Sequence, residues 1–304
     1  MLAWIAALVG LFVPPPDAAV AARVQAPWSQ EDLGARVAFV TEPFLGAPYR
    51  LSALGEGDDG DGVDRDPRMR FDAFDCTTFV ETAMALSLAS NLQEARQLLD
   101  AIRYRDGSVA YLARRHFPEA EWIPELTRLG LLQDITREVG GGDVVTTKKH
   151  LDASVWRRAR HRGLPALPDD RIPAGDFVLD ILPLERLLGH QHEIPPGTIL
   201  HIVREDYASV PVRVSHQGIV IKKGGALFVR HAADRMYHSV VDEELERFVR
   251  RLQAYRKWPV AGVHLTKMQT AAAWRRQVLV SPKPTTPAPT PTPTPPQTPT
   301  TPAR

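Results

Sequence analysis

Residues 71–88, FDAFDCTTFVETAMALSL, contain Cys76, the only cysteine among 304 residues. Apolar side chains recur there at steps of three and four, which predicts an amphipathic helix with one buried face. These side chains are Phe79, Val80, Ala83, Met84 and Leu88. Cys76 would lie at the start of the helix. Either Asp75 caps it, or Thr78 does so with Glu81 completing a capping box.

The position of Cys76 bears on its reactivity. Free backbone N–H groups and the positive end of the helix dipole favour a thiolate over a thiol, and a neighbouring histidine adds to this effect. A lone cysteine is nevertheless most often a small buried apolar residue. A catalytic interpretation therefore requires a partner elsewhere in the chain.

Composition narrows the class of protein. With 44% apolar and 24% charged residues, the chain has the make-up of a soluble globular protein. A formal charge of +1 argues against nucleic acid as the partner. One cysteine cannot form an intrachain disulfide or a multi-cysteine zinc site.

The two ends of the chain differ from its body. Residues 2–13 form a short apolar run, followed by three prolines and small residues up to Ala22. This pattern predicts a signal peptide over residues 1–22 and export to the periplasm or cell envelope, although no Lys or Arg precedes the apolar run. An interfacial anchor or a misassigned start is the alternative, and no stable membrane span is expected in the mature protein. Residues 281–304 are rich in proline and threonine and predict a disordered tail.

The body, residues 27–275, is predicted to be one α+β domain with helices first and a sheet second. A helical insertion is expected at about residues 90–165. The expected helices cover residues 28–40, 92–102, 109–117, 124–132 and 242–252. The expected strands cover residues 177–182, 198–203, 212–221, 227–231 and 260–265.

Two groups of residues have side chains of the kind that bind metal ions. The acidic stretch 55–66, GEGDDGDGVDRD, lacks the glycine and glutamate spacing of an EF-hand, which favours a solvated loop. His190 and His192 stand beside Glu193, but a closed zinc site needs a fourth ligand that the sequence does not supply. We therefore predict neither a metal nor a cofactor.

Two histidines flank a predicted hairpin. His216 lies in VSHQGIVI and His231 in LFVRHAAD, with the turn KKGG between them. A loop centred on Lys223 and Gly224 would pair positions whose numbers sum to 447, which places the two histidines directly opposite each other. A loop centred on Gly224 and Gly225 would shift the pairing by two residues.

A cysteine at a helix start and two facing histidines suggest nucleophilic catalysis. Cys76 would attack a carbonyl, His216 would take and return the proton, and His231 would fix the tautomer of His216. The backbone N–H of Cys76 and a second donor would hold the oxyanion.

Five motifs occur in order along the chain: GAPY at 46–49, DCTTFVE at 75–81, RYRDG at 103–107, SHQGI at 215–219 and RHA at 230–232. Together they resemble the bacterial N-acetylmuramoyl-L-alanine amidase-like family, a branch of the papain-like, NlpC-type cell-wall cysteine hydrolases. The resemblance covers residues 41–265.

The resemblance implies a papain-like fold and hydrolysis of amide bonds in peptidoglycan or its fragments. It assigns Cys76 as the nucleophile, His216 as the base and His231 as the third polar member. It also makes four residues of these motifs candidates for substrate binding: Tyr49, Asp75, Arg103 and Tyr104. Thr77 stands where relatives outside this branch commonly have serine.

The expected substrate is therefore peptidoglycan or a muropeptide, with the bond between the lactyl group and L-Ala as first choice. The alternatives are a D-Glu–diamino-acid endopeptidase, an acyltransferase, and an inert wall-binding module in which Cys76 is structural. The sequence does not specify the oligomeric state.

Overall fold

A computed structural model describes residues 12–29, 32–159, 167–272 and 274–275. The predicted Pro/Thr-rich tail and the first eleven residues of the predicted signal peptide lie outside these residues.

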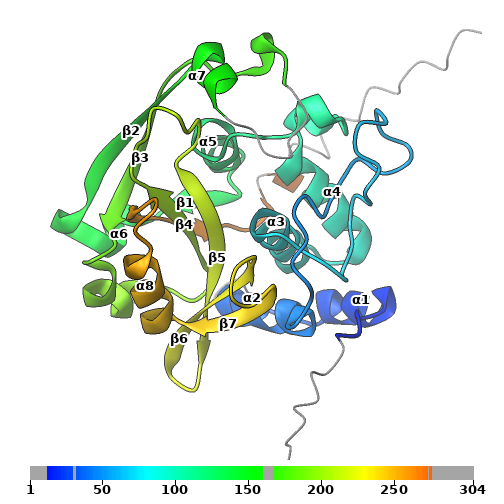
Figure 1. Ribbon diagram of the computed structural model, residues 1–304. Helices are drawn as coiled ribbons and strands as arrows, with labels where there is room; N and C mark the ends of the chain where they lie inside the picture. The colour runs from blue at the N-terminus through cyan, green and yellow to red at the C-terminus, as the bar shows by residue number, and fades with distance from the viewer. Residues whose placement is uncertain (1–11, 30–31, 160–166, 273, 276–304) are drawn as a thin grey trace, which may run out of the picture.

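A sheet of eight strands forms the centre of the molecule (Figure 1). Its strand order is β2-β3-β8-β4-β5-β6-β7, with β1 pairing separately with β8, and every pairing is antiparallel. The strands are β1 (Leu132–Asp134), β2 (Val145–Leu151), β3 (Gly175–Pro183), β4 (Thr198–Arg204), β5 (Val214–Lys223), β6 (Ala226–Ala233), β7 (Ser239–Glu244) and β8 (Val260–Met268). The described chain is therefore a mixed helix and antiparallel-sheet protein, as the α+β prediction required.

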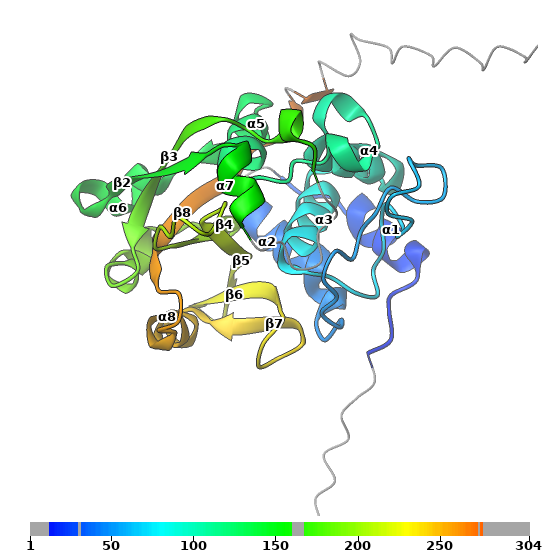
Figure 2. The same cartoon turned by 45° about the horizontal axis from the view of Figure 1, so that its top comes forward.

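The helices lie on both faces of this sheet, and Figure 2 shows α1 to α4 together on one side of the strands. They are α1 (Asp17–Gln25), α2 (Leu33–Thr41), α3 (Cys76–Leu88), α4 (Leu92–Arg103), α5 (Ile123–Arg128), α6 (Thr136–Gly140), α7 (Ala153–Arg158) and α8 (Leu245–Ala254). A π-helical turn, Pro118–Trp122, leads into α5. A 3-10 helix, Leu187–Glu193, precedes β4.

Each face of the sheet has its own apolar core because side chains alternate along a strand. On β4, Ile199 and Val203 pack with the cluster that includes α1 to α5. Leu200 and Ile202 of the same strand pack instead with α6 and α8. The helix that begins at Cys76 thus covers one face, and α8 covers the other.

Helix α1 is tied into the first core. Val20 and Val24 are each 1% exposed, and full burial of such a side chain contributes about 1.5–3 kcal/mol. The guanidinium of Arg36 donates to the carbonyl oxygens of Val24 at 2.6 Å and of Ala89 at 3.2 Å, so it joins the C-terminal ends of α1 and α3. The predicted cleavage position, Ala22, lies inside this packed helix. No helix in the described ranges is long and apolar enough to cross a bilayer.

Several predicted elements differ from the observed ones. The strands expected from apolar runs at 177–182, 198–203 and 260–265 are confirmed as β3, β4 and β8. The helix expected at 109–117 is wrong, because only a 3-10 turn, Tyr111–Ala113, forms there and Tyr104 bridges to Arg114. The helix expected at 242–252 begins only at Leu245, after a strand, β7, that the sequence did not reveal.

Candidate active site

Asp75 is the N-cap of α3, which decides between the two caps that the sequence left open. Its Oδ1 accepts the backbone N–H of Thr78 at 2.7 Å, and the Thr78 hydroxyl accepts the N–H of Asp75 at 2.9 Å. Its Oδ2 accepts the N–H of Ser52 at 2.8 Å. Both carboxylate oxygens are thus used within the protein, and Cys76 becomes the first helical residue.

Cys76 is half-buried, and its surroundings keep it protonated. Burial and the neighbouring charge of Asp75 raise the pKa of its thiol to about 12, although hydrogen bonds from the backbone N–H of Gln217 and from Thr77 act in the opposite sense. The expectation of a resting thiolate is therefore wrong. Loss of solvation and the capping carboxylate together outweigh the effect of the helix N-terminus.

The backbone N–H of Gln217 is near enough to lower the pKa of the thiol, so the sulfur lies near β5, close to the residue that follows His216. The pairing of β5 with β6 begins only at Ile219 and Arg230. The backbone of Gln217 therefore lies before the paired region, where the N-terminus of α3 can approach it.

The hairpin register differs from the preferred prediction. The turn lies at Gly224 and Gly225, so the numbers of paired residues sum to 449 and not to 447, as in the pair of Val220 with Val229. Both glycines have positive φ, 54° and 88°, the conformation that a two-residue hairpin turn requires and that glycine adopts without strain. The placement of His216 directly opposite His231 is therefore wrong.

The two imidazoles nevertheless meet. His216 Nε2 lies 2.8 Å from His231 Nδ1, with the rings nearly perpendicular at 86°. In the observed register, His231 faces Gly218, whose missing side chain leaves room: a Cβ there would lie 3.1 Å from His231 Cβ. The shifted register thus brings the rings together across a glycine.

Glu243 of β7 extends this pair and was not foreseen. Its Oε2 lies 3.3 Å from His231 Nε2, and it is fixed by Arg251 of α8 at 2.7 Å. Burial alone would raise the pKa of the Glu243 carboxyl, but His231 and Arg251 outweigh it and lower that pKa to about 2. A buried carboxylate therefore stands at the end of the row His216–His231–Glu243.

The row specifies where the protons lie. The Glu243 carboxylate favours the proton on His231 Nε2, so His231 Nδ1 accepts the proton of His216 Nε2. His216 Nδ1 is then the free basic nitrogen. Burial holds the pKa of His216 well below its usual value, and the charge of His231 acts in the same direction, so the resting imidazole is neutral. The arrangement can accept one proton at His216 Nδ1 and stabilise the resulting cation through Glu243.

Tyr49 lies beside the cysteine. Its pKa is raised by burial and by the charges of Cys76, Asp75 and Asp234. Its backbone N–H donates to His238 O at 2.8 Å, which ties it to the loop between β6 and β7. Among the four predicted substrate-binding residues, Tyr49 is the one whose side chain is both part-exposed and electrostatically coupled to Cys76.

Arg103 and Tyr104 are placed differently. Arg103 is 6% exposed, and its guanidinium pairs with Glu81 of α3 at 2.5 Å and donates to Leu54 O at 3.0 Å. The hydroxyl of Tyr104, a fully buried residue, donates to Glu56 Oε1 at 3.0 Å. These contacts support the loop before α3, and the substrate-binding role assigned to both residues stays a prediction.

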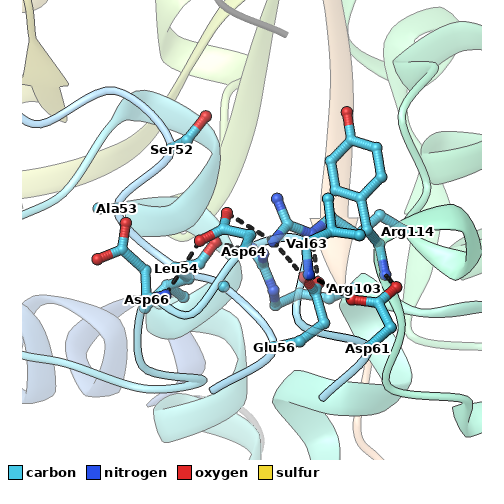
Figure 3. Close-up of polar contacts among 12 residues, drawn as sticks. Ser52, Ala53, Leu54, Glu56, Asp61, Val63, Asp64, Asp66, Arg103 and Arg114 are labelled. Atoms are coloured by element: carbon cyan, nitrogen blue, oxygen red, sulfur yellow. Dashed lines mark hydrogen bonds and ion pairs between the residues drawn. The ribbon is translucent and has the colours of Figure 1, made fainter. Parts of the chain in front are cut away.

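The acidic loop 55–66 is held by arginine. Arg114 contacts Glu56 at 2.6 Å and Asp64 at 2.8 Å (Figure 3). Glu56 is fully buried, and Asp61 accepts the backbone N–H of Tyr111 at 2.7 Å. The solvated loop expected from composition is therefore, in part, a buried ion-pair network.

The fold and this geometry define an α+β protein with a cysteine at a helix N-terminus and a row of two histidines and a glutamate on the neighbouring strands. Residues 39–255 match the family model described as AmiA-like, N-acetylmuramoyl-L-alanine amidase-like. The chain belongs to this family.

Two solved structures share the fold. A Legionella pneumophila protein of the DUF1460 family aligns with a TM-score of 0.71 and 22% identity over 83% of this chain and 94% of its own. An N-acetylmuramoyl-L-alanine amidase from Bacteroides uniformis aligns with a TM-score of 0.62 and 24% identity over 79% of this chain and 100% of its own. No curated protein sequence matches the chain.

Proposed function

We propose that this protein is a cysteine-dependent amidase with a papain-like, NlpC-type site that cleaves the N-acetylmuramoyl-L-alanine bond of peptidoglycan or muropeptides. The row His216–His231–Glu243 is the observation that carries the proposal, together with the effect of the backbone N–H of Gln217, the residue after His216, on the Cys76 thiol. The family and the Bacteroides amidase support the class of bond.

The reaction begins from a neutral pair. The Cys76 thiol gives its proton to His216 Nδ1 while the sulfur attacks the lactyl carbonyl carbon, and the carbonyl oxygen takes the negative charge. The free N–H groups at the start of α3 stabilise this oxyanion. Glu243 stabilises the cation formed on the two histidines, which offsets the cost of separating charge in a buried site.

The second half restores the enzyme. The C–N bond breaks as His216 returns its proton to the amine of L-Ala, and an acyl-enzyme remains on the sulfur. Water then gives a proton to His216 and attacks the thioester. The C–S bond breaks, His216 returns the proton to sulfur, and the lactyl carboxylic acid leaves and gives its own proton to water.

Mass spectrometry of digested muropeptides tests the proposal. The wild-type protein should release a stem peptide with a free L-Ala amine, and Cys76→Ala should release none. The exposed His192 provides a matched control, since His192→Ala should leave the products unchanged. Cleavage by Cys76→Ala would contradict the mechanism, and a product cut after D-Glu would assign the endopeptidase alternative instead.

We further propose that the protein is exported to the periplasm or cell envelope. The packing of α1 supports processing before Asp17 rather than at Ala22, because loss of Val20 would open the first core. Sequencing the N-terminus of protein recovered from the envelope checks this. A mature chain that begins at Arg23 would contradict cleavage before Asp17.

A further inference from the structure

A cavity of about 380 Å³ lies away from Cys76, where the sheet forks. Strand β8 pairs with β3 through Gly262 and Val263 and with β1 through residues 266–268, which leaves His264 between the two partners. Helix α5 lies beside this fork (Figure 1) and contributes Ile123 and Pro124 to the wall.

Two buried acceptors in the cavity lining lack a protein partner among the described residues. His264 is 2% exposed, and its Nδ1 donates to Asp180 O at 2.8 Å, because a carbonyl oxygen can only accept. In neutral His264 the opposite nitrogen, Nε2, is then an acceptor, and it has no hydrogen-bond partner. A buried acceptor without a hydrogen bond lowers the stability of the fold unless a donor reaches it.

Glu119 supplies the second acceptor. It is 5% exposed, and its Oε1 accepts the backbone N–H of Arg213 at 2.5 Å. Its Oε2 makes no hydrogen bond within the described part of the chain. Burial raises the pKa of this carboxyl, and the backbone N–H groups of Arg213 and Val214 act in the opposite sense. Asp134 lies on the same lining with a side chain that is 43% exposed, and its Oδ1 stands 4.0 Å from His264 Nδ1.

The lining therefore combines acceptors and apolar walls with the acidic side chain of Asp134 at its edge, and no Lys or Arg belongs to it. A bare ion would leave the apolar walls Ile123 and Leu179 unused. An amine whose ammonium donates to Glu119 and His264 would satisfy both acceptors while its carbon body packs on those walls. A cavity of this size lies at the lower end for small-molecule sites.

We propose that this cavity binds a primary ammonium compound of about amino-acid size, at a site separate from the candidate active site. The separation follows from the sheet: His264 is paired with His201, and His201 with Gln217, so the fully buried His201 lies between the cavity and Cys76.

Calorimetry on the full chain with n-pentylammonium tests this site, with pentan-1-ol and pentanoate as probes of the same length. The ammonium should bind at least tenfold more tightly than the other two. Glu119→Gln keeps the shape and the bond to Arg213 but presents an amide in place of a carboxylate, so it should weaken binding at least tenfold. Glu125→Gln, on α5 but outside the cavity lining, is the matched control and should bind as wild type does.

Asp134→Asn provides a second variant at the cavity mouth should Glu119→Gln fail to fold, and it should also weaken binding. Cys76→Ala should bind n-pentylammonium unchanged, which keeps this result distinct from the amidase proposal. Equal binding of pentan-1-ol and the ammonium, or full affinity in a folded Glu119→Gln or Asp134→Asn variant, would overturn the inference.

Discussion

The thiol of Cys76 and the ring of His216, the two groups that the proposed mechanism would couple, both rest without charge, because burial raises the pKa of the thiol and lowers that of the imidazole. Burial opposes both the thiolate and the imidazolium, so in the proposed mechanism the proton would stay on sulfur until a substrate carbonyl is in place. Glu243 then matters most in the transition state, where the histidines become cationic. Catalysis would thus depend on charge that appears only during reaction.

The pH dependence of alkylation tests this protonation state. Only the thiolate reacts with iodoacetamide, so a pKa of about 12 predicts slower labelling of Cys76 at pH 7 than of a model thiol. The rate should rise by about tenfold per pH unit up to pH 10, since each unit multiplies the thiolate fraction by ~10. Asp75→Asn keeps a cap but removes a charge that raises the pKa, and should label faster. A rate that levels off near pH 6 would show a thiolate instead.

Gly218 tests the geometry of the histidine row. A Cβ at this position would lie 2.6 Å from Val229 Cγ1 and 3.1 Å from His231 Cβ, so Gly218→Ala must displace one of them. A displacement near 1 Å in a catalytic group can cost ~10²-fold in rate. We expect kcat on muropeptides to fall by about that factor. Gly142→Ala, where nothing lies within 4 Å, is the control, and equal kcat for both variants would contradict the positioning argument.

At the scale of elements, α3 is held between the sheet and the insertion by a buried ion pair. Glu81 of α3 pairs with Arg103 of α4 and accepts the indole N–H of Trp122 at 3.1 Å. The sequence suggested Glu81 as a capping residue; its carboxylate instead links three segments. The position of the Cys76 helix thus depends on residues of two later elements.

Arg103→Ala should therefore destabilise the fold strongly, because it leaves the Glu81 charge buried and unpaired, at a cost of about 3–5 kcal/mol. Arg128 pairs with Glu125 on the surface, with side chains 65% and 32% exposed, so Arg128→Ala should reduce the stability far less than Arg103→Ala. Urea unfolding of both variants measures the difference. Equal losses of unfolding free energy in the two variants would show that the buried pair contributes no more to stability than the surface pair.

The sequence predicts elements well where the pattern is local. Apolar runs identify β3, β4 and β8, and three-and-four spacing identifies the helix of Cys76. It fails where structure depends on a distant partner. Residues 239–244 form β7 because β6 offers an edge to pair with, and only that pairing brings Glu243 to His231.

The register of the β5–β6 hairpin shows the same limit at closer range. The sequence KKGG allows two positions for the turn. The two positions give strand pairings that are shifted by two residues, so different side chains face each other. The prediction that the histidines face each other is conditional on the first alternative. The structure has the second, and the two rings still meet, at 2.8 Å. Arg103 and Tyr104 carry a motif but no sign of burial, which arises only when α4 packs against the loop before α3.

At the scale of the whole molecule, buried histidines make stability depend on pH. Burial lowers the pKa of His201 and His216 well below the usual value, and lowers that of His116 to about 4. Each folded-state pKa is below the unfolded value near 6.5, so their contribution is fully present above pH 6.5 and is lost as the pH falls towards the folded pKa.

Thermal unfolding between pH 7 and pH 4 should therefore show a steady decrease in Tm. His201→Gln removes one such group while retaining a polar side chain beside Gln217 and Thr266, so the decrease should become shallower. The exposed His192 serves as the control, because His192→Gln should leave the slope as it is. An unchanged slope in His201→Gln would mean that other groups determine acid unfolding.

The proton held on Cys76 also has a chemical consequence outside catalysis. Peroxides oxidise thiolates, and a thiol that keeps its hydrogen reacts slowly with them. The chain has no second cysteine with which a sulfenic acid could form an internal disulfide, so oxidation of Cys76 would have no repair within the molecule. The burial that raises the pKa of this thiol therefore also protects the chain's single cysteine from oxidants.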